Sequence, residues 1–194
     1  GGNPAGAATQ AAARAAAAKP MRAAAALAAA YPAVPAGAGY RFGPAPAWVK
    51  PVPAATTAAQ PVAPGAKARR EPLVDMQVQL APKSATASYV HLQRVALDTS
   101  TLREVSEPQI SFNPAYQQLV IHQIGVLRDG QRLDRLKDAR IELMRREQML
   151  ERQMIDGVRT ALGVIRDVRV GDVVDLAYTL EGENPIFEGR YSAL

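Results

Sequence analysis

The chain has 194 residues, enough for one domain and a tail, and its formal net charge of +5 is unevenly distributed. Residues 1–72 carry a net charge of +7 and residues 73–194 a net charge of −2, so the folded part lacks a basic surface and we expect no nucleic-acid partner. The sequence contains no cysteine, which excludes a disulfide framework, a thiolate metal site and a cysteine nucleophile from these 194 residues.

Residues 1–38 are an alanine-rich leader that we predict to be disordered. Read from Met21, the leader has a short positive start, an alanine core and the small residues Ala36-Gly37-Ala38, an order typical of a secretory signal peptide. The alternative is low-complexity sequence with no targeting role. The core is much shorter than the roughly 20 apolar residues of a membrane-spanning helix, so we expect no transmembrane segment.

Residues 39–72 are predicted to be an extended linker, because seven prolines in this stretch disfavour helix and regular sheet. Trp48 either anchors this linker on the folded body or is an exposed aromatic side chain in a solvated segment.

Residues 73–194 contain short apolar stretches separated by turn residues, which indicates an all-β, mainly antiparallel β-sandwich. Residues 73–80 alternate between apolar and polar side chains, which predicts a half-buried strand. Its inner face would consist of Val74, Met76, Val78 and Leu80. Further strands are predicted at residues 89–97, 110–112 and 159–165, with a turn at residues 98–100.

The clearest element is a β-hairpin between Gln118 and Leu136. Residues 119–127 are apolar and β-branched, Asp129-Gly130 favours a tight turn, and residues 131–136 form the return strand. Because an isolated hairpin is barely stable in water, this hairpin predicts a sheet that it joins.

The segment after the hairpin leaves two interpretations open. The first is a strand at residues 140–145 followed by a short helix near residues 147–153, and the alternative is one amphipathic helix over residues 138–155. A turn at residues 168–172 then leads into a long strand. This strand is predicted to bury Val174, Leu176, Tyr178 and Leu180 and to expose Asp175 and Thr179. The sequence stops at Leu194, soon after that strand, so we expect the sandwich to be incomplete there.

Few residues suggest chemistry. His91 and His122 are the two histidines, and neither has a metal-binding spacing, so we expect structural histidines in or beside the sheet. The group Asp167, Asp172 and Asp175 surrounds a turn without the spacing of a calcium loop, which favours a turn-forming role.

A charge-dense stretch, Arg145-Arg146-Glu147 with Glu151-Arg152, is predicted to be a solvated face, with a docking surface as the alternative. The sequence has no G-x-S-x-G elbow and no phosphate-binding glycine loop. We therefore predict no catalytic, cofactor-binding or metal-binding residues.

Several short sequence segments, which follow one another in a fixed order along the chain, carry a family resemblance. They are Tyr40-Arg41-Phe42 with Pro46 to Val49, Leu73 to Val78, Ser111 to Gln117, His122 to Gly130, Asp167 to Asp172 and Tyr178 to Pro185. Together they resemble the domain of unknown function found N-terminal to transglutaminase-like domains in envelope proteins of mainly Gram-negative bacteria. The most specific marks are Arg128-Asp129-Gly130 in the hairpin and Val170-Gly171-Asp172 before the long strand.

The resemblance covers about residues 39–194 and implies a β-sandwich accessory module that is exported to the periplasm or cell envelope. It implies a transglutaminase-like partner domain downstream in cis, with a Cys-His-Asp triad, and allows an envelope protein as a further partner. This chain ends before such a domain begins, and no site residue of the family can be transferred to it.

Two alternatives remain. The first alternative is a hydrolytic enzyme that uses His122 with the carboxylates of Asp167 to Asp175. This hypothesis requires these groups to meet in a concave site. A stand-alone secreted binding or adhesin-like domain requires an exposed aromatic platform, for which Tyr40, Trp48 and Tyr116 are the candidates.

Overall fold

We describe a computed structural model of the chain over residues 31–54, 71–80, 86–145 and 157–182. The chain divides into two units, Gly1–Pro32 and Ala33–Leu194, and the elements described below belong to the second. Several predictions fall outside the described residues: the signal peptide read from Met21, the helix near residues 147–153, the charge-dense stretch beyond Arg145 and the incomplete end after residue 182.

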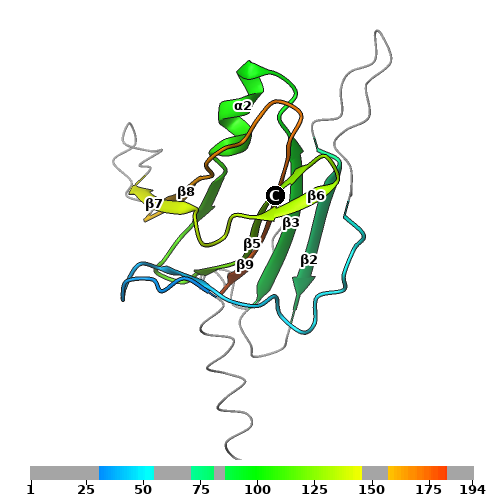
Figure 1. Cartoon of the computed structure of the whole chain (residues 1–194). Helices are drawn as coiled ribbons and strands as arrows, with labels where there is room; N and C mark the ends of the chain where they lie inside the picture. Colours follow the sequence, from blue (N-terminus) through cyan, green and yellow to red (C-terminus); the bar gives the residue numbers. More distant parts are fainter. Residues whose placement is uncertain (1–30, 55–70, 81–85, 146–156, 183–194) are drawn as a thin grey trace, which may run out of the picture. The chain divides into compact units, whose positions relative to one another are not determined.

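The larger sheet is mixed but mostly antiparallel (Figure 1). Its strands follow the order β1 (Tyr40–Phe42), β5 (Gln118–Arg128), β9 (Val173–Glu181), β3 (Ala87–Val95) and β2 (Leu73–Gln79), with β6 (Gln131–Asp134) paired to β5. Only β1 runs parallel to its neighbour among these described strands, and it shares one edge of β5 with β6. The prediction of a mainly antiparallel β fold is therefore confirmed.

The smaller sheet has the order β4 (Gln109–Phe112), β8 (Arg159–Val164) and β7 (Arg140–Arg145), all antiparallel. The strand predicted at residues 140–145 is confirmed, so the alternative of one helix over residues 138–155 is wrong for this part. The buried side chains of this sheet are apolar or hydroxyl-bearing: Ile110, Phe112, Thr160 and Ala161.

In the described part of the chain, helix α2 (Thr99–Ser106) replaces the turn predicted at residues 98–100. Asp98 caps it, because its carboxylate accepts a hydrogen bond from the Thr101 amide while the Thr101 hydroxyl bonds back to Asp98. Hydrogen bonds from Ser100 and Thr101 lower the pKa of Asp98 from 3.8 to about 2. The sequence contained this capping signal, Asp98 with Thr101 three residues later, and the prediction of a turn overlooked it.

The hairpin forms as predicted between β5 and β6. Asp129 and Gly130 have φ angles of 50° and 75°, the two left-handed conformations that a tight hairpin turn requires. The register pairs Arg128 with Gln131 and Gly125 with Asp134.

The burial of the large sheet corrects two predictions. Asp175 and Thr179 are predicted to face solvent but are 1% and 0% exposed, because both faces of β9 are covered. On β2 the predicted inner face is the exposed one: Val74, Met76 and Val78 are 54%, 66% and 37% exposed. Alternation located both strands correctly, but it does not tell which face another part of the chain covers.

The proline-rich segment contributes to the sheet at its start. Tyr40–Phe42 forms β1 and pairs with Leu119 to Ile121 of β5, although residues 39–72 were predicted to lack regular sheet. The three strand residues precede the first proline of that run, Pro44, so the local sequence does not oppose the pairing. Further on, Lys50 makes two hydrogen bonds to the Gln77 side chain of β2. Within the described residues, no helix is both long enough and apolar enough to cross a membrane.

Candidate functional site

Arg128, at the end of β5, binds the turn that precedes β9. Its guanidinium donates to both oxygens of Asp172, from Nε to Oδ1 at 2.9 Å and from Nη2 to Oδ2 at 2.8 Å. Nη2 also donates to the carbonyl oxygen of Asp167 at 2.6 Å. The side chains of Asp172 and Arg128 are 3% and 19% exposed, so this two-point ion pair is largely withdrawn from water. We call these three residues the arginine clamp.

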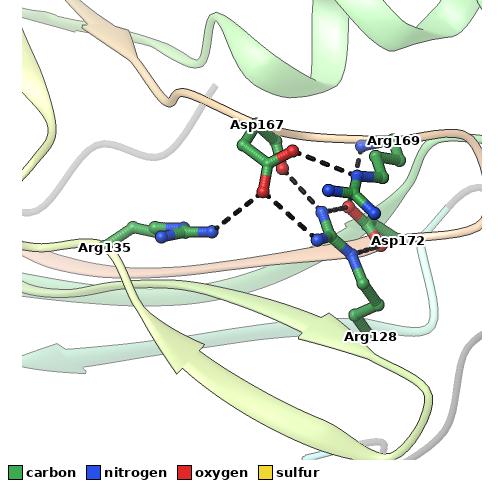
Figure 2. A network of polar contacts seen from close by, with 5 residues as sticks. All are labelled: Arg128, Arg135, Asp167, Arg169 and Asp172. Atoms are coloured by element: carbon green, nitrogen blue, oxygen red, sulfur yellow. Dashed lines mark hydrogen bonds and ion pairs between the residues drawn. The ribbon is translucent and has the colours of Figure 1, made fainter.

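Three arginines donate hydrogen bonds to the Asp167 carboxylate, as Figure 2 shows. Its carboxylate accepts hydrogen bonds from Arg128, Arg135 and Arg169 at 3.2, 3.3 and 3.0 Å. The bond from Arg128 is the largest cause that lowers the pKa of Asp167, and the bond to Asp172 is the largest cause that raises the pKa of Arg128. Each group is therefore held in its charged form, which suits an ion-pair network and not proton transfer.

His122 is the extra residue of a β-bulge in β5. Ile121 pairs with Tyr178 and Gln123 with Ala177, so His122 has no cross-strand partner of its own. Its Nδ1 donates to the Gly43 carbonyl at 2.9 Å, and its Nε2 accepts from the Thr179 hydroxyl at 2.7 Å. Its ring also stacks on Tyr89. Burial lowers the pKa of His122 below 6.5, so the neutral ring that this bonding pattern requires is also the favoured form.

A second polar cluster lies around Asp175 in the centre of β9. Its Oδ1 bonds to His91 Nε2 at 2.6 Å, and its Oδ2 accepts from Gln123 at 2.7 Å and from Arg132. The side chain of Asp175 is 2% exposed and that of His91 is 12% exposed. The carboxylate is thus satisfied by partners from β3, β5 and β6, which together we call the Asp175 cluster.

Gly125 makes room for the Asp175 cluster. It lies directly opposite Asp175, and a Cβ atom at this position would come within 3.2 Å of the Arg132 guanidinium. The absence of a side chain lets Arg132 reach across β5 to the buried carboxylate.

The residues that the enzyme hypothesis combined have different hydrogen-bond partners in the structure. His122 binds Gly43 and Thr179, Asp167 and Asp172 bind Arg128, and Asp175 binds His91. In the described part of the chain, His91 bonds through Nε2 to the Asp175 carboxylate. No group of three histidine or acidic residues there could hold a metal ion.

The aromatic candidates for a binding platform are each partly withdrawn from solvent. Tyr40, Trp48 and Tyr116 are each only half-exposed. The Tyr40 ring contacts the Phe42 ring edge-to-face at a centroid distance of 5.9 Å. A solvent-open hollow of about 530 Å³ beside α2 has a polar lining of both charge signs, formed by Arg94, Ser100, Arg103, Glu104, Glu107 and Gln109. It contains no histidine.

The described residues thus form a mostly antiparallel β fold in which Arg128 pairs with Asp167 and Asp172, and His91 pairs with Asp175. Residues 82–193 match the model of a family described as a domain of unknown function with a solved structure, DUF3857. The match covers more than half of the chain, and the chain belongs to this family. No curated protein sequence matches the chain.

One solved structure, described as a "putative protease" from Parabacteroides distasonis ATCC 8503, is similar at 15% identity with a TM-score of 0.48. The match covers 57% of this chain and 22% of that one, so this chain spans about a fifth of the length of the similar protein.

The arginine clamp predicts a specific loss of stability. Lysine cannot bind both oxygens of Asp172, so Arg128→Lys should lower the urea midpoint of unfolding. Asp172→Asn should do the same, and the double variant should lose less than the sum of the two. As a control, Arg103→Lys alters an exposed pair with Glu107 and should change the free energy of unfolding by no more than about 0.5 kcal/mol. Strictly additive effects of the two clamp variants would contradict the clamp.

His122 predicts a pH dependence of stability. Its folded pKa is lower than its unfolded value, so its contribution is fully present above 6.5 and is lost as the pH falls from there toward the folded pKa. The slope is at most about 1.4 kcal/mol per pH unit. His122→Asn keeps a donor for the Gly43 carbonyl and cannot be protonated, so it should flatten the slope. Urea unfolding between about pH 8 and pH 5 measures the difference. An unchanged slope in the variant would refute this assignment.

Proposed function

We propose that this chain is the non-catalytic N-terminal accessory module of an exported transglutaminase-like protein, one whose catalytic domain has a papain-like cysteine peptidase fold. The module positions that downstream domain or binds a partner in the cell envelope. The observation that carries this proposal is that the groups capable of chemistry bond to one another within the module: Asp175 holds His91, and Arg128 holds Asp167 and Asp172. The chain also has no cysteine.

The family marks support the same proposal. Arg128 of the Arg-Asp-Gly hairpin and Asp172 of the Val-Gly-Asp turn are the two most specific residues of the resemblance, and they are partners in the arginine clamp. Residues that mark the family are thus explained by the architecture of the module. A stand-alone secreted binding or adhesin-like domain is less well supported, because Tyr40, Trp48 and Tyr116 are half-exposed and provide no flat aromatic surface.

Activity should belong to the longer protein and not to this module. We expect the reading frame to continue after Leu194 into a domain with a Cys-His-Asp triad. The protein from the complete frame should hydrolyse casein or incorporate amines into it, and should lose this activity when the triad cysteine is replaced by alanine. The 194-residue chain alone should show no turnover above buffer.

The control for this experiment is His91→Asn in the complete protein, which should leave the activity unchanged once the variant is shown to be folded. A stop codon directly after Leu194 would contradict the proposal. So would turnover by the isolated chain that His91→Asn abolishes.

Export is tested separately. Residues 21–38 fused to a phosphatase that is active only in the periplasm should give active enzyme in a Gram-negative host. Leu27→Arg places a charge in the middle of the alanine core. It should reduce the phosphatase activity by at least about tenfold, because the charge interrupts the apolar region. Cytoplasmic retention of the unmodified fusion would contradict export from Met21.

A further inference from the structure

A row of side chains crosses one face of the large sheet from β5 to β2. The register places Gln77 of β2 opposite Tyr89 of β3, and Tyr89 opposite Thr179 of β9, so these three side chains share a face. The ring of His122 on β5 stacks on Tyr89 and accepts a hydrogen bond from Thr179. The row therefore ends in a polar side chain on each side, His122 on β5 and Gln77 on β2.

The segment from Gly43 to Lys50, which we call the strap, runs from β5 to β2 across the large sheet (Figure 1). At its start, the Gly43 N–H donates to the Ile121 carbonyl at 3.1 Å, and the Gly43 carbonyl accepts from His122 Nδ1 at 2.9 Å. At its end, Lys50 bonds to the Gln77 side chain. Gly43 is the one buried residue of the strap, and its other residues are exposed or half-exposed. The strap is therefore held by main-chain atoms at both ends.

The Gln77 amide binds both polar main-chain groups of Lys50. Its Oε1 accepts from the Lys50 N–H at 2.8 Å, and its Nε2 donates to the Lys50 carbonyl at 2.7 Å. These are the two bonds that a residue of an antiparallel strand exchanges with its partner. Nε2 also donates to the Asp75 carboxylate at 2.8 Å, and because a carboxylate only accepts, this contact fixes which side of the amide carries the donor. Asp75 thus orients the group that binds Lys50.

Both attachment points of the strap directly precede a proline, in Gly43-Pro44 and Lys50-Pro51. A residue before proline is restricted to extended conformations, and an extended residue presents its N–H and its carbonyl in the way that Gln77 binds them. The contacts at Lys50 involve no atom of its side chain. The row of side chains therefore recognises the conformation of the main chain and not the identity of the residue.

We propose that this row is a peptide-binding site for the main chain of an extended segment in which a residue other than proline directly precedes a proline. The strap occupies the site in cis, and a segment of the same chemistry from another chain binds there when the strap is detached. The strap competes with such a segment at an effective concentration of about a millimolar, as a short connection gives. This proposal does not depend on the accessory-module function.

The competition by the strap is tested with two variants of the 194-residue chain. Lys50→Pro removes the N–H that Gln77 binds and should detach this end of the strap, whereas Lys50→Ala keeps both main-chain groups and is the matched control. A fluorescein-labelled synthetic peptide of residues 43–54 is titrated into each chain and followed by fluorescence anisotropy. The Lys50→Pro chain should bind the peptide at least about tenfold more tightly than the Lys50→Ala chain, in which the strap still competes. Adding Gln77→Leu to the Lys50→Pro chain should remove this binding.

Changes in the peptide test whether the main chain is what the site recognises. A peptide with Lys50→Ala should bind the Lys50→Pro chain within about threefold of the unmodified peptide, and a peptide with Lys50→Pro at least about tenfold more weakly. Equal binding of the two altered peptides would overturn the proposal. So would equal binding of the unmodified peptide by the two chains.

A last measurement follows the strap in a chain with its own residues 43–50. Trp48 is the sole tryptophan and lies in the strap, so quenching of its fluorescence by acrylamide reports release of the strap. Gln77→Leu should raise the quenching constant by about twofold, because this end of the strap opens locally. The control is Gln79→Leu, which changes the next residue on the same face of β2 and should leave quenching unchanged. Far-UV circular dichroism shows that each variant is folded, and unchanged quenching in Gln77→Leu would overturn the proposal.

Discussion

The two-point ion pair between Arg128 and Asp172 fixes where β5 ends and where β9 begins. The two strands are neighbours over their whole length, from Gln118 opposite Glu181 to Leu127 opposite Val173. Their paired ends meet at the arginine clamp, where one guanidinium spans both oxygens of a buried carboxylate. A shift of β9 by one residue would break that pairing and would also exchange the two faces of the strand. The clamp therefore holds the register on which the burial of Asp175 and Thr179 depends.

That register places polar groups in the middle of a covered sheet. A buried carboxylate is tolerated only if its oxygens are bonded, and Asp175 meets this requirement with His91, Gln123 and Arg132. The buried His122 ring also has hydrogen-bond partners. The β-bulge at this residue turns the imidazole toward the Thr179 hydroxyl and the Gly43 carbonyl. The N-terminal segment is thereby attached to the sheet by a side chain in addition to the backbone pairing of β1.

Local patterns predicted the positions of these strands, because alternation and the Asp129-Gly130 turn are short-range signals. These local patterns did not predict which face of each strand is buried. Asp175 and Met76 each follow the alternation rule, yet the acid is inside and the methionine outside, since the outcome depends on segments distant in sequence. The Asp175 cluster was likewise beyond prediction: His91 and Arg132 reach the carboxylate only through the registers of β3 with β9 and of β6 with β5.

The contacts that fix these registers also affect the protonation states of two ionisable groups. Catalysis needs an acid or base that can change its protonation state next to a substrate. In this module Asp167 is held ionised by Arg128 and His122 is held neutral by burial, and each already has its hydrogen-bond partners. Asp167 and His122 are therefore stabilised in one protonation state by the same contacts that tie the end of β5 to the turn before β9 and the segment around Gly43 to the sheet.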